Sequence, residues 1–240
     1  MTKETRSVPT SPDCSRPSAW YEIVGTSHIA RQAVRRVKAA FVDFLPDVVA
    51  LELDQGRLAA LLADAKPSHG VGMLRVVGVR GYVFALLASW LQRRLGRVVD
   101  MTPGVDMLAA FQEAKRTQMR VLLIDQDIQC TLRKLSKALG WRELRQVFAD
   151  MWNGILGRET VRFNLQGVPS EALVTRLLDE FRARYPRPYT VLVEERNQYM
   201  TRALQAYHSK FPEHKVLVVV GAGHKAGMLA LLARSDAKKS

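Results

Sequence analysis

Two histidines each close a short glycine motif near opposite ends of the chain. His28 ends the run Val-Gly-Thr-Ser-His that begins at Val24, and His224 ends the run Val-Gly-Ala-Gly-His that begins at Val220. Each motif follows an apolar run typical of a strand and precedes a segment typical of a helix. Neutral imidazoles are common ligands of zinc, manganese and cobalt and also serve as general bases. The repeated pattern predicts that His28 and His224 contribute to one site.

One carboxylate lies inside an otherwise apolar run. Glu52 stands between Leu51 and Leu53, in a segment that is typical of a buried strand. A buried carboxylate without a partner costs several kcal/mol, so Glu52 must contact a cation. Two interpretations remain open at this point: Glu52 is a metal ligand or catalytic group, or it forms a structural ion pair with Arg57.

Four consecutive polar residues, Glu194 to Asn197, begin another helix-like segment. Acidic residues are favoured at a helix N-terminus for electrostatic reasons, and this explains one of them. It does not explain the whole group, in which an amide and a guanidinium accompany two carboxylates. Glu195 and Arg196 are therefore added to the candidate site residues.

Strand-like apolar runs alternate with helix-like segments along most of the chain. This order predicts an α/β fold with a mostly parallel central sheet flanked by helices, in which ligands bind beyond the carboxyl ends of the strands. His28, Glu52 and His224 all follow or end predicted strands. The predicted strands are 21–24, 48–53, 120–124, 189–193 and 215–220, and the predicted helices are 29–44, 54–65, 71–95, 106–115, 131–152, 170–184, 195–207 and 225–233.

A length of 240 residues with 48% hydrophobic content is suited to one hydrophobic core. We expect a flexible tail at 1–19, one domain over 20–235 with a mostly helical insertion near 128–186, and a basic tail at 236–240. The longest apolar stretch, 71–91, is interrupted by Arg75 and Arg80, and its uncharged part is shorter than the roughly 20 residues that span a bilayer. We therefore expect no transmembrane segment.

The chain has two cysteines and a net charge of +13. The two cysteines form no disulfide framework or metal-binding pair, which favours a reducing, cytoplasmic setting. The charge favours non-specific association with nucleic acid or with an anionic surface. Neither observation fixes the oligomeric state, and a homo-oligomer is compatible with both.

Taken together, these motifs resemble the TraB family, which includes the pheromone-shutdown proteins and is related to the Tiki metalloproteases. The resemblance covers roughly residues 21 to 234. It rests on Gly25-Thr26-Ser27-His28, on Pro46 to Asp54 with Arg57, on Asp125-Gln126-Asp127-Ile128, on Glu194-Glu195-Arg196-Asn197 with Met200, and on Gly221-Ala222-Gly223-His224. Many family members have an arginine where this chain has Gln126.

The resemblance implies a Tiki-like α/β fold, distantly similar to that of erythromycin esterases, and a divalent-metal-dependent peptidase. Manganese, cobalt or zinc would be the cofactor, with a peptide or small molecule as substrate. In this view His28, Glu52, His224 and Glu195 supply the metal ligands and the general base, while Arg57 and Arg196 orient carboxylates or stabilise an oxyanion. Two alternatives stay open: a metal-free site with His28 as the base, and a non-catalytic regulatory protein that sequesters a peptide or ligand in the same crevice.

Overall fold

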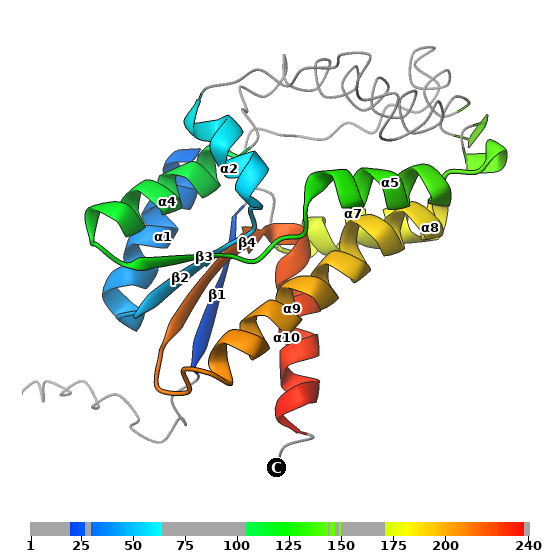
Figure 1. Cartoon of the computed structure of the whole chain (residues 1–240). Helices are drawn as coiled ribbons and strands as arrows, with labels where there is room; N and C mark the ends of the chain where they lie inside the picture. The colour runs from blue at the N-terminus through cyan, green and yellow to red at the C-terminus, as the bar shows by residue number, and fades with distance from the viewer. Residues whose placement is uncertain are drawn as a thin grey trace, which may run out of the picture.

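A four-stranded parallel sheet forms the centre of the computed structural model (Figure 1). The structure describes residues 20–26, 30–63, 104–143, 145–146, 149 and 171–237. The strands are β1 (Tyr21–Thr26), β2 (Val48–Leu51), β3 (Arg120–Leu123) and β4 (Val216–Gly221), in the order β1-β4-β2-β3. The prediction of an α/β fold with a parallel sheet is therefore confirmed.

Strand β4 lies between β1 and β2, so a strand from the C-terminal part of the chain pairs with two strands from its N-terminal part. Its residue Val219 pairs with Val24 of β1 on one side and with Leu51 of β2 on the other. The run Val-Leu-Val-Val-Val is fully buried, as expected for a central parallel strand covered on both faces. This pairing brings the carboxyl ends of β2 and β4, with the residues that follow them, to the same edge of the sheet.

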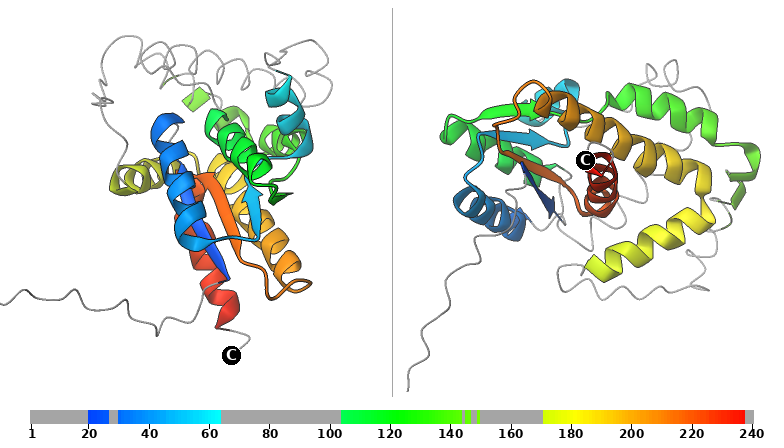
Figure 2. Two further views of the ribbon diagram at one scale, coloured as in Figure 1. Left: turned by 90° about the vertical axis from the view of Figure 1, so that its left-hand side faces the viewer. Right: turned by 90° about the horizontal axis from the view of Figure 1, so that it is seen from below.

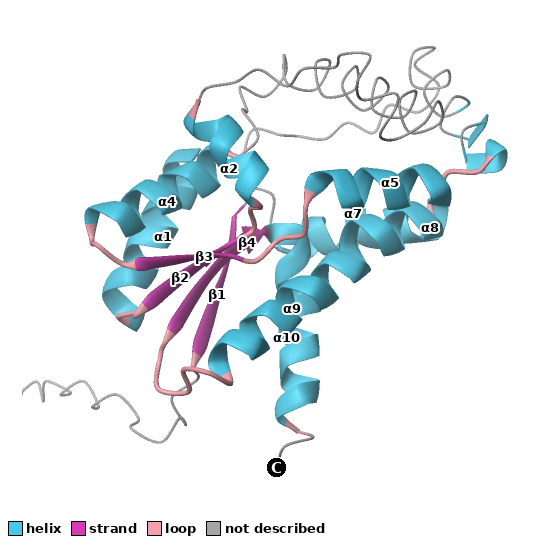
Figure 3. Ribbon diagram, in the orientation of Figure 1, coloured by secondary structure: helices cyan, strands magenta, loops and turns pink. Residues whose placement is uncertain are grey.

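Helices cover both faces of the sheet (Figures 2 and 3). Helices α1 and α4 pack on one face, and α9 and α10 pack on the other. The helices are α1 (Ala30–Phe44), α2 (Gln55–Leu62), α4 (Val105–Arg116), α5 (Ile128–Ala138), α7 (Glu171–Arg184), α8 (Pro186–Tyr189), α9 (Glu195–His208) and α10 (Ala222–Asp236), with a π-helical turn, η1 (Thr190–Glu194), before α9.

The two hydrophobic cores use alternate residues of the same strands. In β2, Val49 and Leu51 contact the core formed with α1 and α4, whereas Val48 and Ala50 contact the core formed with α9 and α10. Successive strand side chains point to opposite faces, so a strand buried on both sides reads as a continuous apolar run. This is why β2 and β4 are both recognisable in the sequence.

The strand predicted at 189–193 is wrong, because this segment is helical. Pro186 occupies the first turn of α8, and the chain continues through η1 into α9 without a break. Val191 is buried against Leu135 and Leu139 of the α5 segment rather than in the sheet, and Val193 is buried as well. Packing against α5 thus overrides the β-propensity of the β-branched run. Proline also favours the first turn of a helix, and here it marks a helix start rather than a loop before a strand.

The helix predicted at 131–152 begins earlier, at Ile128, and is interrupted at Leu139 and Gly140. Helices α5, α7 and α8 lie beyond α9, on the side away from α1 and α4 (Figure 1). Of these, α5 and α7 fall in the predicted helical insertion at 128–186 and α8 begins at its end, while its status as an insertion stays a prediction. The predicted helix at 71–95 lies outside the described residues. No helix in the described ranges is long and apolar enough to cross a membrane.

Replacing a central core residue should destabilise the whole fold. Leu217 of β4 is fully buried, so Leu217→Ala should lower the free energy of unfolding by about 2–5 kcal/mol through lost burial and a new cavity. Urea unfolding followed by circular dichroism measures this. Leu229→Ala on α10, where the leucine is 37% exposed, is the matched control and should change stability by about 1 kcal/mol or less. Equal losses in the two variants would contradict the assignment of β4 to the core.

Candidate functional site

Glu52 lies at the carboxyl end of β2 and is bound at both oxygens. Its Oε1 accepts a short hydrogen bond from Nη2 of Arg196 on α9, and its Oε2 accepts one from the backbone N–H of Gly221, at 2.7 Å. A side chain at position 221 would begin 3.3 Å from Oε2, so glycine leaves room for this carboxylate. The predicted need for a cationic partner is met by Arg196, and the proposed pairing of Glu52 with Arg57 is not found.

Asp125 binds two arginines. It lies two residues after the end of β3. Its Oδ1 accepts from Nε of Arg196 at 3.1 Å, and its Oδ2 accepts from Nη2 of Arg196 at 2.7 Å and from Nη1 of Arg57 at 3.0 Å. The backbone N–H of Gln126 also donates to Oδ1. Two parallel N–H···O bonds to one carboxylate are the strongest form of an arginine pair. Asp125 therefore fixes the plane of the Arg196 guanidinium.

His224 lies in the first turn of α10, beside Glu52. Its Nε2 is 3.0 Å from Nη1 of Arg196 and 3.4 Å from Oε1 of Glu52, and its Nδ1 is 2.7 Å from Oδ1 of Asn197. Arginine can only donate and an amide oxygen can only accept. The imidazole is therefore neutral, with its proton on Nδ1 and the lone pair of Nε2 directed toward Arg196.

The charges of this cluster balance each other. Burial lowers the pKa of His224, and the nearby guanidinium of Arg196 lowers it further against the opposing effect of Glu52. Burial alone would raise the pKa of Glu52, but the charges of His224 and Arg196 and the Gly221 N–H together hold it below its ordinary value. Because His224 is neutral at pH 7, Arg196 and Gly221 keep Glu52 ionised there. Despite burial, the carboxylates of Asp125 and Glu52 raise the pKa of Arg196.

Asn197 is held in place by the close approach of α9 and α10. An added methyl group at Gly227 of α10 would lie 2.2 Å from Nδ2 of Asn197, closer than any real contact. Asn197 is buried on the same side of α9 as Met200 and Leu204, which pack in the core. The packing of two helices thus positions the amide that orients His224.

The structure brings four of the predicted site residues together: Glu52, Arg57, Arg196 and His224. Glu195 turns away from them in the described structure and pairs with Lys134 of α5 at 2.5 Å. Consecutive residues of a helix point about 100° apart, which explains why Arg196 faces the sheet and Glu195 does not. His28 lies outside the described residues, and the roles of all these residues stay predictions.

Two positioning residues were missing from the set predicted from sequence, Asp125 and Asn197. Asp125 carried a signal, because it follows a buried strand at the edge where ligands bind. Asn197 was recognisable too. It stands three residues before Met200 and seven before Leu204, so it lies on the same buried face of the helix. In the described part of the chain, no group of three or more His, Cys, Asp or Glu side chains could hold a metal ion.

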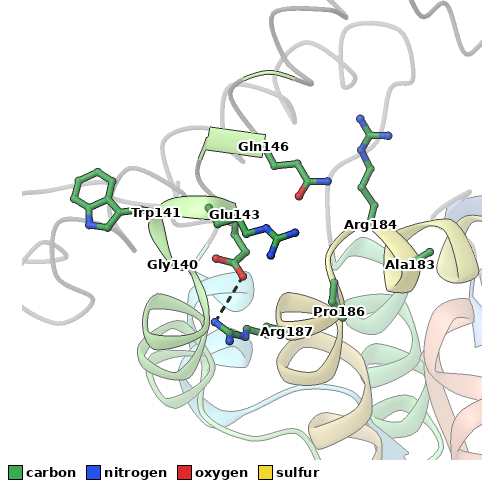
Figure 4. Close-up of a pocket in the computed structure, with 9 residues that line it drawn as sticks. Gly140, Trp141, Glu143, Gln146, Ala183, Arg184, Pro186 and Arg187 are labelled. Carbon is green, nitrogen blue, oxygen red and sulfur yellow. Dashed lines mark ion pairs between the residues drawn. The ribbon is translucent and has the colours of Figure 1, made fainter.

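A separate cavity of about 520 Å³ lies where the segment after α5 meets the end of α7 and the start of α8 (Figure 4). None of the candidate site residues lines it. Glu143 and Arg187 form an ion pair across it at 3.7 Å, while Trp141 points away from the other labelled side chains. The cavity is therefore distinct from the cluster around Arg196.

A family model for TraB/PrgY/gumN proteins matches residues 17–239, nearly the whole chain. The chain belongs to the TraB/PrgY/gumN family. The resemblance inferred from its motifs is thus confirmed, and the matched region contains the Arg196 cluster. Family membership fixes neither a reaction nor a metal for the site described above.

The TraB family relatives come from distant organisms. An uncharacterized protein of Methanocaldococcus jannaschii is 25% identical over 218 residues, which cover 89% of this chain and 53% of that protein. TraB domain-containing proteins of Mus musculus and Homo sapiens are each 24% identical over 231 residues, covering 86% of this chain and 61% of theirs. The chain thus spans a little over half the length of these relatives.

The neutral state of His224 should make stability depend on pH. In the unfolded chain this histidine takes up a proton near pH 6.5, whereas its lowered pKa keeps it neutral in the fold. Below about pH 6.5 the unfolded state therefore binds more protons than the folded state. The free energy of unfolding should decrease as the pH is lowered, by up to about 1.4 kcal/mol per pH unit, until the pH reaches the pKa of His224 in the folded state. Urea unfolding between pH 8 and pH 5 measures this slope. His224→Gln should flatten it, and identical slopes in the two proteins would contradict the assignment.

The contact between α9 and α10 predicts different effects at two glycines of one helix. Gly227→Ala should destabilise by about 1–3 kcal/mol, because its methyl group must displace Asn197. Gly223→Ala is the control, because its methyl group would make an ordinary contact with Leu178 at 3.6 Å and alanine favours a helix. Thermal and urea unfolding compare the two. A neutral Gly227→Ala would show that Asn197 is not held by this packing.

Proposed function

We propose that this protein is a divalent-metal-dependent hydrolase of the Tiki type that acts on peptide bonds. The observation that carries the proposal is the 3.4 Å approach of Oε1 of Glu52 to Nε2 of His224 at the carboxyl edge of the sheet. The other polar atom of each side chain is held, by Gly221 and by Asn197 respectively. Hydrogen bonds of this outer kind orient metal-ligating side chains in many proteins.

The chemistry of this pair suits a metal site. A neutral imidazole and an ionised carboxylate are two of the three protein ligands that a catalytic zinc site usually has, and manganese and cobalt accept similar ligands. In the proposal His28, outside the described residues, is the third. Glu195 remains a predicted general base, and that role requires its carboxylate to leave Lys134.

Arg196 determines how such a site would work. Its guanidinium now contacts both Glu52 and His224, and it must leave them before an ion takes its place. It keeps a second anchor, because Asp125 binds it through two nitrogens. A bound ion would lower the pKa of its water and polarise the scissile carbonyl. Arg196, still held by Asp125, then supplies positive charge for the oxyanion that develops.

A non-catalytic role is the second candidate, and Arg196 is also the observation that favours it. The guanidinium satisfies Glu52 and His224 without any ion, and the described residues alone offer no group of three ligands. A cluster closed in this way would suit a regulatory protein that sequesters a peptide or small ligand in the crevice.

Metal binding and hydrolysis separate the two candidates. We expect the purified protein to contain divalent metal and to melt at a higher temperature with Mn²⁺, Co²⁺ or Zn²⁺, because a ligand at 100 times its Kd stabilises by about 2.7 kcal/mol. His224→Ala and Glu52→Gln should lose most of this shift, and peptide cleavage followed by mass spectrometry should fall about 100-fold or more.

His214→Ala is the matched control for these variants. His214 bonds to Tyr207 at 2.7 Å, away from the cluster around Arg196, so its loss should leave metal content and cleavage unchanged. A folded wild-type protein that contains no metal, shows no thermal shift and cleaves no peptide would contradict the hydrolase and favour the binding protein.

A further inference from the structure

Arg57 of α2 is an arginine with most of its hydrogen-bonding capacity unused. Its Nη1 donates to Asp125 at 3.0 Å. Its Nε and Nη2 have no protein partner among the hydrogen bonds of the described residues. Its side chain is 34% exposed, whereas that of Arg196 is 14% exposed. Arg57 is thus fixed at one nitrogen, and its side chain is partly exposed.

The pairing with Asp125 does not by itself account for Arg57. Asp125 is almost fully buried, and Arg196 already binds it through two hydrogen bonds while the Gln126 N–H supplies a third. The charge of Arg57 balances the second of the two buried carboxylates, but this ion pair uses only one of its three nitrogens. The shared carboxylate holds Arg57 close beside Arg196, at the edge of the cluster.

Arg57 is also close to the proposed reaction centre. Oδ2 of Asp125, which accepts from Nη1 of Arg57, also accepts from Nη2 of Arg196, and that same nitrogen donates to Glu52. Glu52 and Asp125 balance two positive charges, those of Arg196 and Arg57, and of these two guanidiniums Arg57 is the more exposed. Arg57 is therefore the guanidinium of this pair that an incoming anion reaches more easily, and Asp125 already orients it.

We propose that Arg57 is the substrate-anion site of this protein and binds a carboxylate of the substrate through Nε and Nη2. The planar guanidinium presents two parallel N–H donors that match the two oxygens of a carboxylate. The carboxylate belongs either to the C-terminus of a peptide or to an Asp or Glu side chain near the reacting bond. The inference rests on the proposed function for the identity of the substrate as a peptide, but the anion site requires no metal and no cleavage.

Binding of three forms of one peptide tests the inference. The probes are Ala-Leu-Gly-Phe-Ala with a free C-terminal carboxylate, the same peptide as the C-terminal amide, and an amide in which Asp replaces Gly. Calorimetric titration of the full chain without added metal gives each Kd. We expect the free carboxylate to bind about tenfold or more tightly than the amide, because a charge-assisted pair is lost. The Asp-containing amide shows whether a side-chain carboxylate is accepted.

Two variants at Arg57 distinguish recognition from a structural role. In Arg57→Gln the Kd of the free carboxylate and the Kd of the amide should lie within about twofold of each other, because the free carboxylate binds more weakly while the amide binds as before. Arg57→Lys should keep part of the preference for the free carboxylate, because lysine provides a positive charge but not the two parallel N–H donors of a guanidinium. Arg202→Gln is the control: this arginine is exposed on α9 and bonds to Gln198, so the preference should remain. The thermal transition of each variant verifies folding.

The outcomes separate this inference from the proposed function. If the peptides bind with the expected preference but none is cleaved with or without metal, the hydrolase fails and the anion site stands. If cleavage occurs but neither the free carboxylate nor the Asp-containing amide binds more tightly than the Gly-containing amide, the anion site is overturned and the hydrolase stands. Binding of neither peptide, or a preference that persists in Arg57→Gln, also overturns the anion site.

Discussion

The burial of two carboxylates at one edge of the sheet is the constraint on which the rest of this structure depends. Glu52 and Asp125 follow adjacent strands and are both shielded from water. Leaving either without a partner would cost about 3–5 kcal/mol, a large part of the stability of an ordinary domain. One guanidinium, that of Arg196, is hydrogen-bonded to both, and Arg57 supplies the second positive charge through Asp125. The helix that carries Arg196 must therefore lie against this edge whenever the sheet is formed.

This requirement explains the unusual path of the chain into α9. The segment from Pro186 is helical, but the turn at Thr190–Glu194 is wider than an α-helix, with the N–H of Glu195 bonded to the carbonyl of Thr190. The carbonyl of Leu192 accepts a hydrogen bond from Nη1 of Arg196, at 3.3 Å. Wide turns of this kind change which helix residues face a given direction and are frequent at functional sites. Here Arg196 and Asn197 both face the cluster, one toward the carboxylates and one toward His224.

Much of the fold could be predicted from the sequence, because the buried strands are continuous apolar runs. Glu52 was recognisable as the residue that interrupts such a run, and His224 as the histidine that follows another. The partner of Glu52 was not predictable in the same way. Arg57 is five residues away in the sequence, while Arg196 is brought close by tertiary packing, and local spacing favours the nearer residue. The strand expected at 189–193 failed for the same reason, since packing against α5 decides its conformation rather than the β-propensity of Val191 and Val193.

The guanidinium of Arg196 would also oppose the binding of a metal ion at this site. A divalent cation and Arg196 compete for Oε1 of Glu52 and Nε2 of His224. Two unit positive charges about 4 Å apart repel by about 4 kcal/mol at an effective dielectric constant of about 20, and the double charge of the ion doubles this repulsion. Asp125 reduces that conflict, because its carboxylate binds Arg196 without help from Glu52. Its second partner, Arg57, adds to the repulsion, and a substrate carboxylate bound there would cancel that addition. In the proposed hydrolase, substrate binding and ion binding would therefore favour each other electrostatically, with Asp125 as the link between the two arginines.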